Sequence, residues 1–215
     1  MKPFLLVLSS PSGGGKSTIA HQLVEGRDDV AFSVSATTRP IRPGENDGRD
    51  YYFLDEEEFL RKVEAGDFLE WAEYGGYRYG TLAEEVEAIF KTGKHAVLDI
   101  EFEGARQVKQ RHPDSVTVFL LPPSGGELAA RLRGRETENS RQVARRLARA
   151  REELGVAREY DYVVINDDLV VAVGQVAAIV ESESLRVHRH DGLPDRIQQL
   201  QGGVEDALSE SPSAS

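Results

Sequence analysis

Short apolar runs alternate along the chain with longer segments in which apolar residues recur every three or four positions. The apolar runs predict strands at 4–9, 30–35, 96–100, 116–121 and 162–165. The longer segments predict helices at 16–25, 55–65, 81–91, 124–133 and 140–159, and a last helix that ends near Leu185. This alternation predicts an α/β fold in which helices cover both faces of a central parallel sheet.

The pattern changes between residues 35 and 81, where hairpin signals are more frequent. Two strand patterns, at 68–74 and 77–79, flank Gly75-Gly76, which favours a tight hairpin turn. Two pairs have the capping-box spacing that starts a helix, namely Asp55 with Glu58 and Thr81 with Glu84. Region 35–81 is therefore predicted to be an inserted subdomain.

Composition and charge narrow the class of protein. The 215 residues suit one domain with additions, and a net charge of -11 argues against binding nucleic acid over the whole surface. The absence of cysteine excludes disulfides and thiol nucleophiles. No apolar run reaches the length of a membrane span, so we expect a cytoplasmic protein. The polar stretch 186–215 is predicted to be a largely disordered tail, with at most a weak helix at 196–208.

A glycine-rich segment follows the first predicted strand directly. It reads Ser10-Pro11-Ser12-Gly13-Gly14-Gly15-Lys16-Ser17-Thr18 and matches the P-loop pattern except at its first position, where serine replaces glycine. In such a loop the backbone N–H groups converge on phosphate oxygens, and the helix N-terminus and the lysine add positive charge. The serine after the lysine is expected to hold Mg²⁺. The segment predicts a nucleoside triphosphate site; the alternative is an ordinary glycine-rich turn.

Two further features are candidates for binding a second substrate. Arg39 and Arg42 lie in a proline-stiffened stretch, where two guanidinium groups can grip a phosphate, although a solvated basic loop would have the same sequence. Glu70 shares a strand face with aromatic and small residues, so its carboxylate needs a partner unless that face is open to water. Guanine offers two donors, N1–H and the N2 amino group, which one carboxylate can accept together.

With these residues in view, the chain resembles the guanylate kinase family over about residues 3–185. The resemblance rests on ordered motifs at 12–17, 35–45, 48–53, 68–71, 79–81, 98–100, 131–135 and 165–168. It implies a P-loop three-layer α/β fold with a central parallel sheet, a GMP-binding insertion at about 35–81 and a helical lid at about 131–151. It also implies transfer of the γ-phosphoryl group of ATP to GMP, and more slowly to dGMP, with Mg²⁺ as cofactor.

The resemblance further implies roles for individual residues. The residues implied at the ATP site are Ser12, Gly13, Gly14, Gly15, Lys16, Ser17, Thr18, Arg131, Arg135 and Asn166. Those implied at the GMP site are Ser35, Arg39, Arg42, Glu45, Tyr51, Glu70, Tyr79, Thr81 and Asp99, of which Thr81 could read guanine, cap a helix, or do both. The implied catalytic residues are Lys16, Arg39, Asp99, Arg135 and Arg146, and the implied Mg²⁺ residues are Ser17 and, through water, Asp99.

The segment 131–151 is rich in arginine. The resemblance assigns Arg131, Arg135 and Arg146 to the transferring phosphoryl group, whereas Arg133, Arg141, Arg149 and Arg151 are interpreted as a solvated helix face. Three positions depart from the family pattern, namely Ser10, Glu101 and Glu136. Ser10 puts the backbone conformation of the P-loop in question, Glu101 the geometry of the carboxylate that follows Asp99, and Glu136 the hinge of the lid.

Four hypotheses follow for the function. The first is phosphoryl transfer between the small molecules ATP and GMP by a monomer or dimer, with no nucleic acid or membrane as partner. The same fold could instead phosphorylate another acceptor, such as ribose bisphosphate, which has no guanine edge for Glu70, Ser35 and Thr81 to read. A non-catalytic guanylate-kinase-like binding module is a third reading, against which Lys16 and Ser17 speak. RNA binding through the arginines is the fourth, and the overall charge disfavours it.

Overall fold

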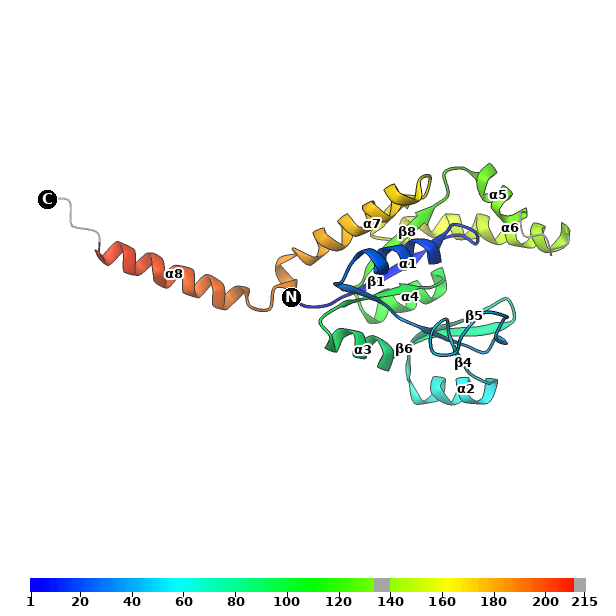
Figure 1. The fold of residues 1–215 in the computed structure, drawn as a ribbon, viewed down its shortest axis with the longest axis horizontal. Coiled ribbons are helices and arrows are strands. Elements are labelled where there is room, and N and C mark those ends of the chain that lie inside the picture. The colour runs from blue at the N-terminus through cyan, green and yellow to red at the C-terminus, as the bar shows by residue number, and fades with distance from the viewer. Residues whose placement is uncertain (134–139, 211–215) are drawn as a thin grey trace.

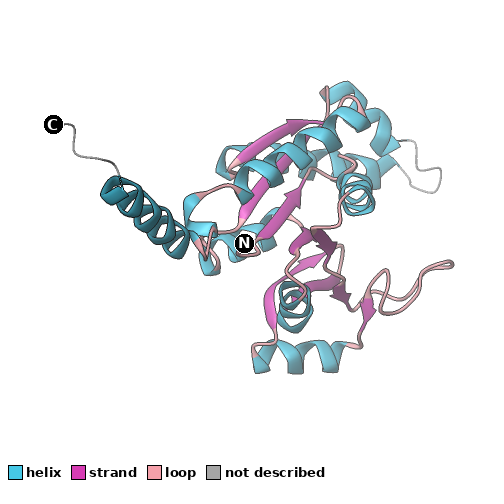
Figure 2. Ribbon diagram, turned by 60° about the vertical axis from the view of Figure 1, so that its left-hand side comes forward, coloured by secondary structure: helices cyan, strands magenta, loops and turns pink. Residues whose placement is uncertain are grey.

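Five parallel strands form the central sheet of the computed structural model, which describes residues 1–133 and 140–210 (Figures 1 and 2). Their order is β2-β7-β1-β8-β9. Their bounds are Leu5–Ser9 for β1, Val30–Phe32 for β2, His95–Asp99 for β7, Val116–Leu121 for β8 and Tyr162–Ile165 for β9. The α/β class and the central parallel sheet are thereby confirmed.

Helices cover both faces of this sheet because β1 is buried on both sides. Leu6 and Leu8 pack with α1 (Lys16–Gly26) and α7 (Leu169–Ser184), whereas Leu5 and Val7 pack with α3 (Ala83–Lys91) and α4 (Phe102–Arg111). This period of two gives each face its own hydrophobic cluster. Two more helices, α5 (Gly125–Arg133) and α6 (Ser140–Gly155), pack against each other through a smaller apolar cluster. A short 3₁₀ turn, η1 (Val156–Glu159), follows α6.

A second sheet of four strands lies beside the first, with the order β4-β3-β6-β5. The strands are β3 (Ser35–Thr37), β4 (Tyr52–Phe53), β5 (Phe68–Tyr74) and β6 (Tyr77–Leu82). Helix α2 (Glu56–Ala65) closes the sheet through Phe59, which stacks on Phe68 within a separate apolar cluster. The predicted hairpin at Gly75-Gly76 is confirmed by the β5–β6 pairing.

The structure differs from the sequence analysis at three places and confirms one capping pair. The strand predicted at 30–35 is two strands, because β2 joins the central sheet and β3 joins the small one. The capping pair Asp55 and Glu58 is confirmed, since the Asp55 carboxylate accepts the Glu58 N–H at 2.7 Å. Thr81 is not a helix cap: α3 begins after Leu82, and the Thr81 side chain points elsewhere. Helix α4 was not predicted, because few of its ten residues are strongly apolar.

The chain after α7 differs most from the prediction. Instead of a largely disordered tail, the structure has a 3₁₀ turn, η2 (Val187–Arg189), and an 18-residue helix, α8 (Leu193–Glu210), which extends away from the body (Figure 1). Apolar side chains on α8 remain exposed, including Leu200 and Leu208. No helix among residues 1–133 and 140–210 is both long and apolar enough to cross a membrane.

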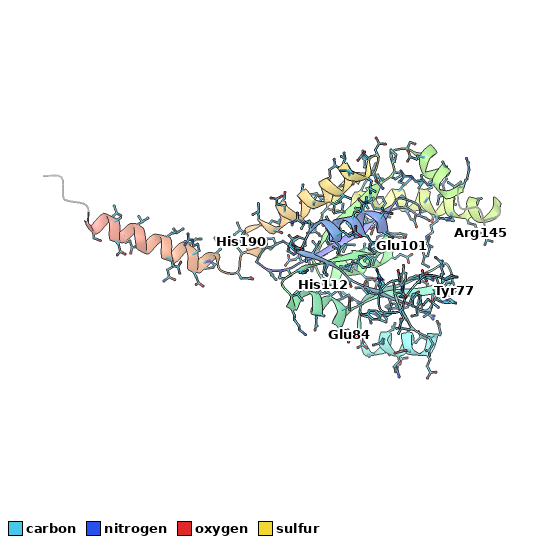
Figure 3. All side chains as sticks on the ribbon, viewed as in Figure 1. Tyr77, Glu84, Glu101, His112, Arg145 and His190 are labelled. Atoms are coloured by element: carbon cyan, nitrogen blue, oxygen red, sulfur yellow. The ribbon has the colours of Figure 1, made fainter. Side chains whose placement is uncertain are left out.

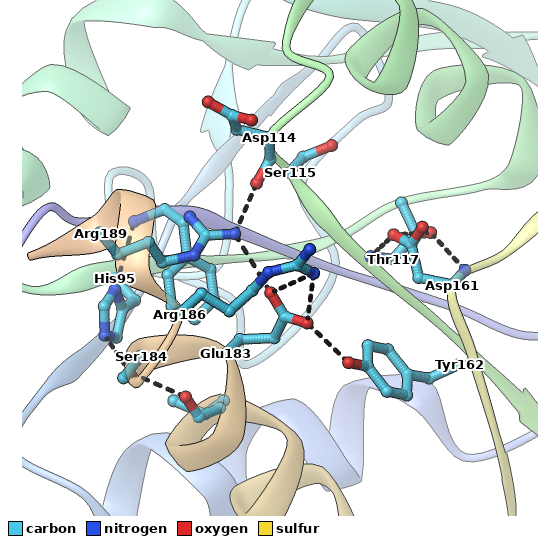
Figure 4. Close-up of polar contacts among 12 residues, drawn as sticks. His95, Asp114, Ser115, Thr117, Asp161, Tyr162, Glu183, Ser184, Arg186 and Arg189 are labelled. Carbon is cyan, nitrogen blue, oxygen red and sulfur yellow. Dashed lines mark hydrogen bonds and ion pairs between the residues drawn. The ribbon is translucent and has the colours of Figure 1, made fainter.

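A buried polar cluster anchors the turn η2 to the amino-terminal edge of the central sheet (Figure 4). The Glu183 carboxylate accepts hydrogen bonds from Arg189, at 3.3 Å, and from the Tyr162 hydroxyl, at 2.6 Å. Arg189 also donates to the Asp114 carbonyl oxygen and lies over the Phe4 ring. The segment just after α7 is therefore part of the folded body.

Candidate active site

The P-loop connects β1 to α1, and glycine is needed at three of its positions. Gly13 and Gly15 have φ values of 82° and 87°, a left-handed backbone conformation that residues with a side chain rarely adopt. At Gly14 a Cβ atom would lie 2.7 Å from the Ser10 Cβ, so a larger residue would displace the loop. Ser10 itself has a negative φ, as do all non-glycine residues in the described part of the chain. Serine at this position therefore leaves the loop backbone unstrained.

Lys16 follows the loop and contacts two carboxylates, that of Asp99 at the end of the neighbouring strand β7 and that of Glu101 just after it. Its Nζ lies 2.9 Å from Asp99 Oδ1 and 3.2 Å from Glu101 Oε1. The contact arises because β1 and β7 are parallel and in register, so that their carboxyl ends meet at one edge of the sheet. Although burial favours the neutral amine, the two carboxylates raise the pKa of Lys16. Glu101, which Figure 3 shows between the two parts of the molecule, thus keeps its carboxylate beside the lysine despite the change from the family pattern.

Side chains from other elements also hold the loop. Asn166, just after β9, donates from Nδ2 to the Gly14 carbonyl oxygen at 2.8 Å. Arg146 of α6 donates from Nη2 to the Ser12 hydroxyl at 3.1 Å. Among the other residues expected at this site, Ser17 and Thr18 are exposed on the first turn of α1. Arg131 pairs with Glu127 within α5. Segment 134–139, which contains Arg135 and Glu136, lies outside the described residues.

Of the residues expected at the GMP site, those around Arg39 are only partly brought together beside the small sheet. Arg39 is buried and makes two hydrogen bonds with the Glu45 carboxylate, at 2.8 and 2.9 Å. Its guanidinium carbon also lies 5.2 Å from the centre of the Tyr51 ring, and the Tyr51 and Tyr79 rings meet edge to face. Arg42, in contrast, is exposed, and its backbone N–H is what binds Glu45. The structure therefore brings Arg39 together with Tyr51 and Tyr79, whereas the Arg42 side chain is exposed to solvent and is not part of this group.

The three residues expected to read guanine are neighbours in the small sheet. Ser35 pairs with Thr81 across β3 and β6, and Thr81 pairs with Glu70 across β6 and β5. The Thr81 hydroxyl donates to Glu70 Oε1 at 2.7 Å, which gives the buried carboxylate one partner. Burial raises the pKa of Glu70 to about 7, and the hydrogen bonds from Thr81 reduce this shift. A carboxylate this buried, with one side-chain donor, can accept further donors from a ligand.

The two parts of the site influence each other electrostatically. Burial raises the pKa of Tyr51, the Asp99 carboxylate on the central sheet adds to the effect, and Lys16 opposes it. The charge of Lys16 also acts to lower the pKa of Glu70. Charged residues at the P-loop edge of the central sheet therefore act on side chains of the small sheet, and the two sheets are also in contact through α4, where Gly104 lies against the Glu70 carboxylate.

Oxygen ligands for a divalent cation are present beside the P-loop. The Ser17 hydroxyl lies on the first turn of α1, and Asp99 lies at the end of β7. Glu101 Oε2 is buried and has no hydrogen-bond partner among the described residues, so it can accept a further donor. A hydroxyl and carboxylates are the ligands of Mg²⁺ that retains several of its waters. The residues present therefore fit this cation, although no group of three or more His, Asp or Glu side chains in the described ranges forms a ready-made metal cluster.

Two functional candidates were missed by the sequence analysis, and both lie on α6. Glu153 is 1% exposed and accepts the Ser12 N–H of the P-loop at 2.9 Å. Arg149, which was interpreted as solvent-facing, donates from Nε to Glu153 at 2.9 Å. The spacing of four residues between opposite charges was the available signal, but the same spacing is common on solvated helices.

Comparison with known proteins gives a consistent result. The family model described as guanylate kinase matches residues 2–183. A guanylate kinase of Thermotoga maritima is 45% identical over 205 residues, covering 95% of this chain and 98% of the relative. One from Symbiobacterium thermophilum is 47% identical over 189 residues, covering 88% of this chain and 90% of the relative. The crystal structure of guanylate kinase from Anaplasma phagocytophilum is 34% identical, covers 91% of this chain and 94% of its own, and superposes with a TM-score of 0.77.

Proposed function

The chain belongs to the guanylate kinase family, and we propose that it transfers the γ-phosphoryl group of ATP to GMP, and more slowly to dGMP. One observation supports the assignment of both substrates to one site: helix α4 begins just after Asp99 and Glu101, which pair with Lys16 of the phosphate loop, and the same helix lies against the buried carboxylate of Glu70 at Gly104. The enzyme would act in the cytoplasm on small molecules, as a monomer or dimer, without nucleic acid or membrane as a partner.

The donor side of this proposal rests on the P-loop. Backbone N–H groups from Ser12 to Thr18 would bind the phosphates of ATP at the N-terminus of α1, and Lys16 would neutralise charge on the transferring group. Asn166 would lie beside the adenosine while holding the Gly14 carbonyl. The arginines Arg131, Arg135 and Arg146, from a lid at about 131–151, would approach the γ-phosphoryl oxygens; of these, Arg146 already contacts the loop.

The acceptor side rests on an insertion at about 35–81. Glu70 would accept both the N1–H and the N2 amino donors of guanine, and Thr81 and Ser35 would serve O6. Arg39, Arg42, Tyr51 and Tyr79 would hold the GMP phosphate, with Glu45 orienting Arg39. Without GMP, the Arg39 guanidinium donates to the Glu45 carboxylate. When GMP binds, Arg39 would donate to the phosphate in addition to Glu45 or in place of it.

We also propose Mg²⁺ as the cofactor, held by Ser17 and, through water, by Asp99. When bound, this ion neutralises phosphate charge and orients the reacting oxygens. The chain's own residues would then position the two nucleotides in line. No general base is needed, because the attacking phosphate oxygen is already ionised at neutral pH. Lys16 and the arginines would stabilise the charge that spreads over the γ-phosphoryl oxygens.

Two alternatives make different predictions. A same-fold kinase for a sugar phosphate would not need a carboxylate buried on the small sheet, yet Glu70 is 3% exposed and paired with Thr81. A binding module without catalysis would not need a P-loop with Lys16 held between two carboxylates. Both features favour the kinase with a guanine acceptor.

A coupled assay of ADP formation tests the proposal directly. Purified protein with ATP and Mg²⁺ is offered GMP, dGMP, AMP, UMP and ribose bisphosphate in parallel. We expect GMP to be used best, dGMP more slowly and AMP roughly 10⁴-fold less well, because a site built for hydrogen bonds rejects a base that lacks them. Turnover of ribose bisphosphate with none of GMP would support the first alternative, and no turnover of any acceptor would support the second.

A further inference from the structure

Arg149 of α6 lies between the P-loop and the small sheet. Its Nε donates to Glu153 Oε1 at 2.9 Å, and its guanidinium carbon lies 4.2 Å from the centre of the Tyr74 ring on β5. About a third of the side chain is exposed, so it is neither a core residue nor a free surface arginine. Arg149 thus contacts the small sheet directly and the P-loop through Glu153.

On the P-loop side, the contact runs through Glu153. This carboxylate is almost fully buried, and its two oxygens have different partners: Oε1 accepts from Arg149, and Oε2 accepts the Ser12 N–H at 2.9 Å. A buried carboxylate is costly unless it is paired, and Arg149 supplies a charged partner for Glu153 beside the loop. The position of Arg149 therefore bears on the geometry of the phosphate loop.

On the acceptor side, the contact continues through aromatic rings. The Tyr74 ring meets the Tyr79 ring edge to face at 6.3 Å, and Tyr79 meets Tyr51 at 6.0 Å. Tyr51 in turn lies beneath the guanidinium of Arg39, the proposed ligand of the GMP phosphate. A continuous series of contacts thus joins Ser12 of the P-loop to Arg39 of the small sheet.

We propose that Arg149 is a positioning residue that couples the ATP site to the GMP site; this rests on the proposed function. Its stacking on Tyr74 stabilises the small sheet beside α6, and its hydrogen bond to Glu153 ties the same helix to the loop that receives the donor phosphates. Each nucleotide that orders its own side therefore favours the contact and raises the affinity for the other. Arg149 itself is not expected to touch either nucleotide.

The experiment measures this coupling as a ratio of affinities. GMP is titrated calorimetrically into the full-length protein, with and without a saturating non-hydrolysable ATP analogue and Mg²⁺. The wild-type protein is expected to bind GMP more tightly when the analogue is present. In Arg149→Gln we expect that ratio to fall about three- to tenfold, the range of a cation–π contact, whatever the change in the affinity for the analogue alone.

Matched variants separate coupling from loss of structure. Arg151→Gln removes an equal charge from an exposed position on the same helix and is expected to retain the wild-type ratio. Tyr74→Phe keeps the ring and is expected to retain it as well, whereas Tyr74→Ala should lower it as much as Arg149→Gln does. The double variant Arg149→Gln with Tyr74→Ala should then be no worse than either single variant, because both remove one contact.

The outcomes distinguish this inference from the proposed function. A folded Arg149→Gln protein with the wild-type ratio would overturn the inference and leave the kinase assignment intact. Equal losses in Arg149→Gln and Arg151→Gln would also overturn it, because they would point to charge alone. A wild-type protein that binds no GMP in either titration would instead contradict the proposed function itself.

Discussion

At the scale of single residues, Glu70 is the residue that we propose selects the acceptor nucleotide. The carboxylate is buried in the small sheet, and burial raises its pKa to about 7. It must be ionised to accept two donors from guanine, so near neutral pH it is poised between the two protonation states. This raised pKa gives two measurable consequences.

The first consequence concerns the affinity for GMP. Below about pH 7 a proton must leave Glu70 before guanine binds, so we expect the affinity to rise with pH up to about 7 and then to level off. Calorimetric titrations between pH 5.5 and 8 measure this. The GMP phosphate itself titrates near pH 6, so the comparison is with Glu70→Gln, which should bind GMP weakly and keep only the phosphate's pH dependence. Parallel profiles for the two proteins would contradict the assignment of Glu70.

The second consequence concerns stability without nucleotide. A carboxyl group whose pKa is raised on folding binds its proton more tightly in the folded state. The free energy of unfolding therefore falls as pH rises from 4.5, the ordinary pKa of a glutamate, to about 7, the pKa of Glu70 in the folded protein, and the contribution of Glu70 is constant outside that window. Urea unfolding across this range should show that decrease, and Glu70→Gln should show less of it. Glu84→Gln, at an exposed position of α3, is the matched control.

At the scale of elements, helix α4 links the two sheets. It follows β7, packs on the central sheet, and also lies along β5, where the Gln107 amide donates to the Trp71 carbonyl oxygen at 2.7 Å. At Gly104 the helix approaches Glu70 so closely that a Cβ atom would lie 2.2 Å from Glu70 Oε2. The glycine therefore leaves room for the carboxylate of the other sheet.

Gly104→Ala tests this arrangement. Alanine suits a helix, but its methyl group would have to displace the Glu70 carboxylate or the helix itself. We expect kcat/KM for GMP to fall about 10²-fold, the cost of an error of about 1 Å in positioning, while binding of an ATP analogue is preserved. Gly174→Ala in α7 has open space around it and should be neutral or slightly stabilising. Unchanged use of GMP by Gly104→Ala would exclude the proposed position of Glu70.

Elements with a strong hydrophobic pattern could be predicted from the sequence, and α4 could not. Strands β8 and β9 have the predicted bounds because their apolar runs are continuous and end in prolines or polar residues. Helix α4 buries only Gly104, Ala105 and Val108, and just one of these, Val108, is strongly apolar. The hydrophobic pattern of this segment therefore cannot be told from that of a loop. Thr81 had the spacing of a helix cap, yet tertiary structure uses its hydroxyl for Glu70. The P-loop could be predicted because its chemistry is local, whereas the role of Arg149 depends on a partner 75 residues away in sequence.

At the scale of the whole molecule, the segment after α7 has two parts with different functions in the fold. Arg189 is buried against Phe4 and Glu183 and holds the chain to the central sheet, and Lys2 donates its N–H to the Arg189 carbonyl oxygen at 2.8 Å. Beyond it, α8 extends away from the body with exposed apolar side chains (Figure 1). We therefore expect the boundary between the part that stabilises the fold and the part that does not to lie just after η2.

Truncations test this boundary. A chain that ends at Asp191 keeps the anchoring cluster, and we expect its melting temperature to stay close to that of the full chain and its turnover of GMP to be unchanged. A chain that ends at Leu185 removes Arg189 and leaves Glu183 with fewer partners, which should lower the melting temperature by several degrees. Calorimetry and the coupled assay on both chains measure this. Equal stability of the two truncated chains would show that the cluster contributes little.

Each of the two sheets has its own hydrophobic cluster, and this separation has a consequence for how the family can diverge. Replacements among the side chains of β3, β5 and β6 that pack only within the small sheet can change which base is accepted without disturbing the packing beneath the P-loop, provided that Leu69 and Tyr74, which contact the central-sheet cluster and Arg149, are kept. A mutant library restricted to these three strands, selected for growth on a different nucleobase monophosphate, should therefore yield variants that phosphorylate a different acceptor. The ATP site of these variants should remain that of the parent protein.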